Sequence, residues 1–257
     1  MTSHPPAASA STKAQAFSLL ELLVVMGILG IAMVILLPAV SGIQTGSGLT
    51  STAHRIADTL SLAREYALAH NTYVWVGIDE VSQSSGAVGP LTDGVGRVVA
   101  SIVASKDGTR IYDVNGDISS DWASKTQGGA GLTQITKLIE IPHAHLTTLS
   151  PGASSSGMNR PPVDPEFQIA SAQAESALSL VYPLSATPAN ARHTFTKIIE
   201  LNPEGTARLL RQANPRQFSR RIEIGLIPTK GETIVEGPNQ AAVQIDSLSG
   251  ATAVFRP

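Results

Sequence analysis

The sequence contains no cysteine, few aromatic residues and almost no net charge. Without cysteine the chain can form neither a disulfide nor a thiolate-ligated metal site, and it has no thiol nucleophile. Its formal net charge of -2 over 257 residues argues against strong non-specific attraction to nucleic acid. Aromatic residues make up only 4% of the chain and hydrophobic residues 42%, so the core must be mainly aliphatic. Stability must therefore come from aliphatic packing or from assembly.

Catalytic signatures are missing as well. The stretch GASSSG at residues 152–157 does not have the spacing of G-x-S-x-G, and the sequence has no P-loop, no G-x-G-x-x-G and no H-E-x-x-H. The isolated carboxylates fall in turn-like segments. The sequence therefore predicts a protein that is not an enzyme, has no catalytic residues and needs no cofactor.

What the sequence does have is a long apolar run at residues 17–40, in which Glu21 is the only ionisable side chain. At about 1.5 Å per residue, a helix of this length would measure about 36 Å and could cross a hydrocarbon core of about 30 Å. A signal peptide has a shorter apolar region of about 7–15 residues, so a membrane-spanning helix is the better interpretation. An acidic side chain in such a helix costs about 2.5–3.5 kcal/mol, so we expect Glu21 to have a cationic partner.

A short polar leader precedes the apolar run. Residues 1–16 are rich in Ala, Ser and Pro, and Lys13 is their only lysine or arginine. Cleavage after Ala16 would give Phe17 a new α-amino group only a few residues from Glu21. That amine is the cation that the glutamate requires.

The stretch AFSLLE at residues 16–21 resembles the processing motif of type IV prepilins and pseudopilins. In that family a small residue, usually Gly, precedes a Phe that becomes the mature N-terminus, and Glu is the fifth mature residue. A membrane-embedded prepilin peptidase cuts on the cytoplasmic side and methylates the new amine. The resemblance implies cleavage between Ala16 and Phe17, methylation of Phe17, and pairing of Glu21 with a neighbouring subunit's N-terminus. Ala in place of Gly before the cut departs from the usual motif.

Other segments extend this resemblance. Pro38 falls at the twenty-second mature position, where pilins commonly carry a proline that kinks the helix by removing one backbone N–H. The segments at 60–76, 198–210 and 242–255 resemble the H-type pseudopilins and their type IV pilus relatives. The alanine before the cut and the extended middle of the chain resemble the prepilin-like cassette protein D group of the Verrucomicrobia.

An amphipathic helix should follow the apolar run. Residues 41–50 contain three glycines, which predicts that the helix loosens there. From Leu49 to Ala67 the apolar positions alternate in spacings of four and three, so one helix face should pack on a sheet. His70 and Asn71 should end the helix, because Asn tolerates a left-handed backbone. The β-branched and aromatic stretch at 72–78 predicts a strand.

Short strands separated by Gly, Ser and Pro clusters are expected through the rest of the chain, with the longest loop at 149–165. The predicted strands are 96–103, 134–141, 194–201, 206–210, 221–227, 242–245 and 251–255. The sequence thus predicts an α+β fold, in which a long N-terminal hydrophobic helix packs on an antiparallel sheet or sandwich. Its parts would be a leader (1–16), a transmembrane helix (17–40), a linker and amphipathic helix (41–71) and a β-rich domain (72–257).

One segment resembles a calcium-binding loop. Oxygen-bearing side chains alternate at Asp113, Asn115, Asp117 and Asp121, as they do where a hard cation is bound. The sixth position is Ile118, where such a loop needs Gly, and the twelfth is a serine in place of the bidentate Glu. A tight turn at 115–116 explains the segment more simply. Calcium is therefore a weak candidate, and no other metal is expected.

Two further groups of residues are candidate binding sites. His143 and His145 form an H-x-H that could place two imidazoles on one strand face, although a partly exposed strand end after Pro142 explains them better. Five arginines could grip phosphates or an acidic partner, but they lack interleaved aromatics, so a solvated hairpin is the better interpretation. These arginines are Arg208, Arg211, Arg216, Arg220 and Arg221.

These features predict a minor pilin or pseudopilin that is anchored in the bacterial inner membrane by a single span. Its globular domain would lie outside the cytoplasm, and it would assemble into a type II secretion pseudopilus or a type IV pilus. The expected partners are other pilin or pseudopilin subunits, the prepilin peptidase and the membrane, and nucleic acid is not expected. The alternatives are a DNA-binding minor pilin used for DNA uptake and an uncleaved single-pass anchored protein.

Overall fold

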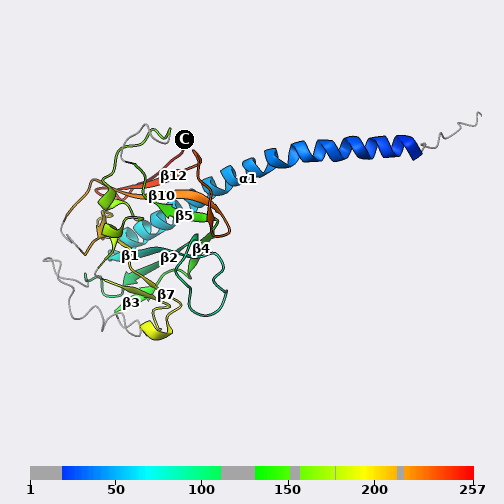
Figure 1. The fold of residues 1–257 in the computed structure, drawn as a ribbon. Helices are drawn as coiled ribbons and strands as arrows, with labels where there is room; N and C mark the ends of the chain where they lie inside the picture. Colours follow the sequence, from blue (N-terminus) through cyan, green and yellow to red (C-terminus); the bar gives the residue numbers. More distant parts are fainter. Residues whose placement is uncertain (1–18, 111–130, 151–156, 177, 213–216) are drawn as a thin grey trace, which may run out of the picture. The chain divides into compact units, whose positions relative to one another are not determined.

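The computed structural model of the 257-residue chain describes residues 19–110, 131–150, 157–176, 178–212 and 217–257 (Figure 1). For residues 34–47 and 188 it describes the backbone alone. The chain divides into two compact units, residues 1–44 and residues 45–257. Helix α1 belongs to both units, and all the strands belong to the second.

Helix α1 runs without interruption from Leu19 to His70. The helix therefore continues through the three glycines of residues 41–50, where the sequence predicts that it loosens. An isolated glycine costs a helix only about 1 kcal/mol relative to alanine, which the rest of a long helix can offset. The predicted end of the helix is confirmed, because Asn71 follows with a left-handed φ of 48°. The backbone N–H of Thr72 then caps the last turn by donating to the carbonyl of Ala67 at 3.1 Å.

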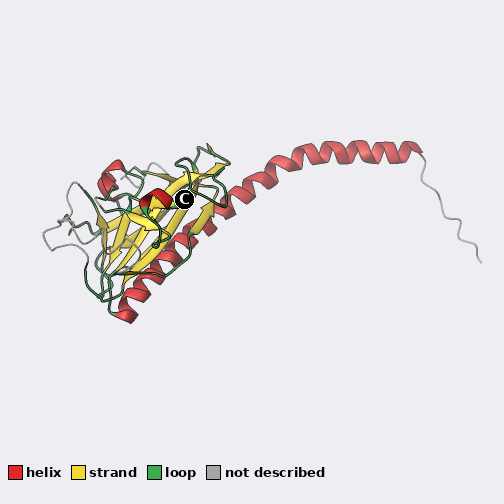
Figure 2. Cartoon of the chain, turned by 90° about the horizontal axis from the view of Figure 1, so that it is seen from below, coloured by secondary structure: helices red, strands yellow, loops and turns green. Residues whose placement is uncertain are grey.

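The second part of α1 carries the apolar stripe that the sequence predicts. Its six positions are each at most 2% exposed, and they pack in a core shared with strands of two sheets. They are Leu49, Ala53, Ile56, Leu60, Ala63 and Ala67. Figure 2 shows this part of the helix lying along the strands. The amphipathic segment of α1 thus packs on the sheets through its apolar stripe.

The first sheet has six antiparallel strands, with β1 and β2 at its centre. Its main order is β3 (Leu132–Gln134), β2 (Gly96–Ser105), β1 (Val74–Ser82), β8 (Ile198–Leu201) and β9 (Ala207–Leu210), and β4 (Ile139–Pro142) pairs with β2 as well. Side chains alternate across this sheet, so that Val74 and Val76 face α1 while Trp75 faces away from it.

The second sheet has five antiparallel strands and is centred on β10. It contains β11 (Thr233–Ile234), β10 (Arg221–Lys230), β12 (Ala241–Asp246), β13 (Thr252–Phe255) and β5 (Ala144–Thr147), of which β5 pairs with β10. A separate ribbon pairs β6 (Leu180–Tyr182) with β7 (His193–Phe195), and its residues cover the outer face of the first sheet. Short 3-10 turns occur at η2 (Pro165–Phe167), η3 (Ala172–Ala174) and η4 (Pro188–Asn190).

The described fold is thus α+β with antiparallel sheets. Two predicted strands are each split in two. Residues 134–141 become β3 and β4, because the chain between these strands leaves the ladder, and residues 194–201 become β7 and β8, which belong to different sheets. Strands β5, β6 and β11 were not predicted, since two to four residues are too few to show a period.

Replacing Asp246 with alanine should lower the free energy of unfolding by about 1–2 kcal/mol. In the turn between β12 and β13, Asp246 Oδ1 accepts hydrogen bonds from the backbone N–H groups of Leu248 (3.2 Å) and Ser249 (3.0 Å). The hydrogen bond from the backbone N–H of Ser249 is the main reason why the pKa of Asp246 lies below its ordinary value of 3.8. Because the folded pKa is depressed, this stabilisation is present above pH 3.8 and is lost as the pH falls through the folded pKa.

Urea unfolding followed by tryptophan fluorescence, at neutral pH and in strong acid, measures this effect of Asp246. Asp246→Asn is the matched control, since it keeps the acceptor oxygen and removes the charge. The hydrogen-bond account fails if the alanine variant is as stable as the native chain at neutral pH.

Candidate functional site

The predicted processing segment is only partly described. Ala16 and Phe17 lie outside the described residues, and of Pro38 only the helical backbone is described. Glu21 lies in the first turn of α1, where the positive end of the helix dipole stabilises a negative charge. The described part of the site is therefore Glu21 and the apolar helix that follows it.

This helix is apolar on every side. Eleven large apolar side chains between Leu19 and Met33 are each 49–83% exposed. A helix with apolar side chains all around it is normally covered by protein or by lipid, and a continuous exposed apolar surface marks a place of interaction. Within the residues whose side chains are described, no helix is both long and apolar enough to cross a membrane. The span predicted for residues 17–40 is therefore not confirmed.

Two of the four candidate arginines that the structure describes, Arg208 and Arg211, are directed at carboxylates. Arg211 is buried, its Nη2 lies 2.8 Å from Glu166 Oε2, and its guanidinium lies over the ring of Phe167 at 4.7 Å. Arg208 Nη2 lies 3.5 Å from Glu200 Oε1. These two cations are directed at carboxylates of the same chain, which argues against phosphate binding by the group.

Two of the other three arginines are described. Arg220 is exposed, whereas Arg221 is half-buried and its charge helps to lower the pKa of Asp246. Arg216 lies outside the described residues, as do the calcium-loop candidates Asp113, Asn115, Asp117 and Asp121. The structure therefore tests neither the calcium loop nor the fifth arginine.

His143 and His145 do not act together. His143 precedes β5 with a left-handed φ of 63°, so the H-x-H does not lie within one strand. His145 lies on β5, and its Nδ1 is 2.8 Å from Glu80 Oε2 and 3.0 Å from Glu80 Oε1. This partner could not be predicted from the sequence, because β1 and β5 are far apart along the chain. Across the described ranges, no group of three or more His, Asp or Glu side chains is arranged to hold a metal ion.

A buried polar network that sequence reasoning missed lies on the outer face of the second sheet. Arg160 Nη1 is 2.6 Å from Glu223 Oε2, and both side chains are at most 3% exposed. Gln244 Nε2 donates to the same carboxylate at 2.8 Å and to the carbonyl of Pro161 at 2.7 Å. Burial raises the pKa of Glu223, although Gln244 and Arg160 oppose this effect. The network ties the segment around residues 158–169 to β10 and β12, which is a structural role.

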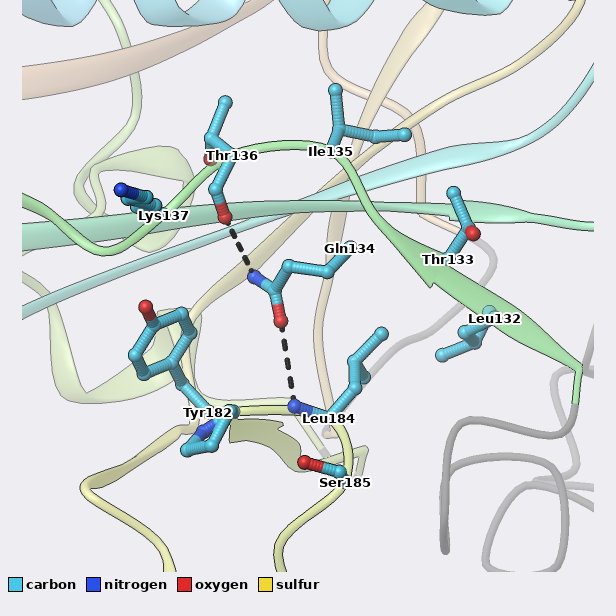
Figure 3. Close-up of a pocket in the computed structure, with 10 residues that line it drawn as sticks. Leu132, Thr133, Gln134, Ile135, Thr136, Lys137, Tyr182, Leu184 and Ser185 are labelled. Atoms are coloured by element: carbon cyan, nitrogen blue, oxygen red, sulfur yellow. Dashed lines mark hydrogen bonds between the residues drawn. The ribbon is translucent and has the colours of Figure 1, made fainter.

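An open pocket of about 440 Å³ lies between residues 132–137 and residues 182–185 (Figure 3). At its centre Gln134 Nε2 donates to the carbonyl of Thr136 at 2.9 Å, and Gln134 Oε1 accepts from the backbone N–H of Leu184 at 3.3 Å. Tyr182 and Lys137 lie at its sides. None of its ten lining residues is a histidine or a carboxylate, so the pocket lacks the usual general base.

Comparison with known protein families bears on the N-terminal segment alone. Residues 11–37 match the prokaryotic N-terminal methylation motif. The matched range contains Ala16, Phe17 and Glu21, so this chain carries a prepilin-like motif at the residues from which the sequence predicts processing. The motif is that of a type IV pilin-like or pseudopilin precursor. No curated protein and no solved structure matches the chain, so the narrower resemblances to H-type pseudopilins and to the cassette group gain no support.

Proposed function

We propose that this chain is a minor pilin or pseudopilin, a structural subunit of a type II secretion pseudopilus or a type IV pilus. The observation that carries the proposal is the methylation motif at residues 11–37, which leads directly into a helix that is apolar on all sides. We further propose that the chain has no catalytic activity and uses no cofactor.

In this proposal the apolar helix serves first as an anchor and then as the core of a filament. Residues 17–40 hold the precursor in the inner membrane, and residues 45–257 form a domain outside the cytoplasm. Prepilin peptidase removes residues 1–16 and methylates Phe17. Beyond the bilayer, the exposed apolar side chains would face water unless neighbouring helices covered them, and their burial favours assembly by about 25 cal/mol per Å².

Glu21 gives the assembly its axial register. A neighbouring subunit's methylated N-terminal amine would lie beside the Glu21 carboxylate inside the filament core. In that apolar environment a charge without its counter-charge costs several kcal/mol, so only the alignment that pairs the two groups is stable. The pair cannot form until the leader has been removed, so cleavage has to precede assembly.

The proposal predicts that the membrane-extracted chain begins at an N-methylated Phe17. Intact-mass spectrometry of the purified full chain should show loss of residues 1–16 and the addition of one methyl group. Ala16→Glu is the matched control, because a long charged side chain replaces the small residue before the cut and should leave the leader in place. A native chain that still contains Lys13 would instead indicate an uncleaved anchored protein.

A DNA-binding pilin receives less support. It would need arginines that are free to meet phosphates, but Arg211 is buried against Glu166 and Arg208 faces Glu200. The net charge of -2 also provides no general attraction to nucleic acid.

A further inference from the structure

The open pocket between residues 132–137 and residues 182–185 carries a positive charge. Among its ten described lining residues, Lys137 is the only charged one, and it is exposed. In Figure 3, Tyr182 lies on the same side of Gln134 as Lys137, and its ring packs against the core while the residue stays partly exposed. An ammonium group and a phenol hydroxyl can both donate to a carboxylate. This side of the pocket therefore favours an anionic group.

Four polar side chains around the pocket have no partner among the described residues. Neither the hydrogen bonds nor the ion pairs of the described chain include their side-chain groups. They are Thr133, Lys137, Tyr182 and Ser185. The side chain of Gln134 differs, because it makes three hydrogen bonds, one with a serine hydroxyl and two with backbone groups. The four unpartnered groups can therefore bind a ligand without breaking a contact of the fold.

The backbone of β3 provides further binding groups, because among the described strands β3 pairs with β2 alone. The carbonyl of Gly131 accepts a hydrogen bond from the β2 side at 3.0 Å, and the backbone N–H of Ile135 donates to β2 at 2.9 Å. Backbone groups alternate in direction along an antiparallel strand, so the N–H and C=O of Gln134 point away from β2. No described residue pairs with them. An extended chain can pair with such a free edge.

The shape of the pocket suits a short extended chain. The pocket is open to solvent, whereas sites for small molecules usually enclose most of the ligand. Gln134 and Lys137 are three positions apart, a separation that a few residues of extended chain can span. Pro183 and Leu184 line the pocket as well and offer an apolar surface to a neighbouring side chain.

We propose that this pocket binds an extended acidic segment of another protein. The backbone of the segment pairs with Gln134 at the edge of β3, and its carboxylate lies against Lys137 and Tyr182. Because an exposed charge pair is individually weak, the backbone pairing and the carboxylate have to act together. The site lies entirely in the globular unit and goes beyond the proposed function, since it requires neither cleavage nor assembly.

Fluorescence anisotropy of synthetic peptides tests the proposal with the full chain in detergent micelles, and empty micelles serve as the blank. Three probes are heptapeptides of alternating Thr and Val with blocked ends, a neutral dye and one Glu at the second, fourth or sixth position. A fourth probe lacks Glu but has a free C-terminal carboxylate. We expect at least one probe to bind, and the loss of its carboxylate, by Glu-to-Gln exchange or by amidation, should weaken binding about tenfold. The probe that binds best shows whether the carboxylate comes from a side chain or from a chain end.

Two further peptides test the pairing with β3. N-methylation of one set of alternate residues should weaken binding about tenfold, since it removes the N–H that faces Gln134. N-methylation of the other set should have little effect. Acetate, which carries a carboxylate but no backbone, should compete far more weakly than the peptide.

Substitutions in the chain locate the site. Lys137→Gln should weaken binding of the best probe about tenfold, because it removes the charge opposite the carboxylate. Tyr182→Phe removes only the hydroxyl and should weaken binding several-fold. Lys230→Gln is the matched control, because it removes an exposed lysine at the end of β10, outside the pocket, and should leave binding unchanged. Urea unfolding of each variant checks that the fold is kept.

Three outcomes would overturn the inference. The first is that no probe binds at millimolar concentration. The second is that Lys230→Gln weakens binding as much as Lys137→Gln, which would indicate a general attraction to positive charge. The third is that both N-methylated peptides bind equally well, or that acetate competes as well as the peptide, since the edge of β3 would then have no role. None of these results bears on the methylation of Phe17, so the proposed function is tested separately.

Discussion

Chains with Glu21→Ala should be inserted and cleaved normally but should be almost absent from filaments. The substitution removes one half of the proposed ion pair and leaves a neighbour's amine in an apolar core without its counter-charge. Breaking a buried pair in this way costs about 3–5 kcal/mol, which corresponds to a loss of incorporation of roughly two to four powers of ten. The measurement is the ratio of variant to native chain in sheared filaments when both are expressed together.

Two controls isolate the charge of Glu21 from its shape. Glu21→Gln keeps the size and loses the charge, so it should behave like the alanine variant. Glu21→Asp keeps the charge on a shorter side chain and should retain part of the incorporation. Equal amounts of all variants in the membrane fraction would show that insertion is unaffected. If the alanine variant entered filaments as well as the native chain, the glutamate would have no role in setting register.

Arg160→Ala should destabilise the globular unit by about 3–5 kcal/mol. The Glu223 side chain is fully buried, and removal of the arginine leaves its carboxylate without a counter-charge. Arg192→Ala is the matched comparison, because Arg192 Nη2 also lies 2.7 Å from a carboxylate, that of Glu140, but both side chains are about a quarter to a third exposed. That substitution should cost less than about 1 kcal/mol. Urea unfolding at neutral pH measures both.

The pH dependence of the Arg160→Ala effect has a definite sign. Burial raises the pKa of Glu223 above 4.5 in the folded protein. A carboxyl with a raised folded pKa favours folding most below its unfolded pKa, and this contribution is lost as the pH rises through the folded value. Removing the arginine should raise the folded pKa further, so the destabilisation should be largest at neutral pH and should shrink below pH 4.5. Adding Glu223→Gln should recover most of the lost stability, and a pH-independent loss would contradict the charge-based explanation.

Several features of the fold could be predicted from the spacing of residues within one element. The spacing from Leu49 to Ala67 gave the buried face of α1, and Asn71 marked its end, because both depend on residues that are neighbours along one helix. The helix continues through residues 41–50, where loosening was predicted, because glycine propensity is a weak preference within a helix of 52 residues. The break inside residues 134–141 was missed because it depends on how strands pair, which a single strand's sequence does not encode.

The buried ion pairs could not be predicted from the sequence. Glu223 alternates with Ile222 and Ile224 in β10, so it reads as a solvent-facing residue of a half-buried strand. It is buried because the segment that carries Arg160 crosses that face of the sheet. Glu80 and His145 are likewise joined only when β1 and β5 are brought together. Ion pairs between segments that are distant along the chain produce no periodic pattern in the sequence. The N-terminal motif, in contrast, is contiguous and could be recognised directly.

The way α1 is covered has a consequence for synthesis of the chain. Its buried stripe begins at Leu49, yet the strands that close the core over it include β12, which begins at Ala241. At about 5–20 residues per second, a ribosome needs roughly 10–40 s to make the intervening chain. Throughout that interval the stripe has no native partner from β12. Until β12 has been made, the stripe can be covered only by strands that precede it along the chain, such as β1 and β2.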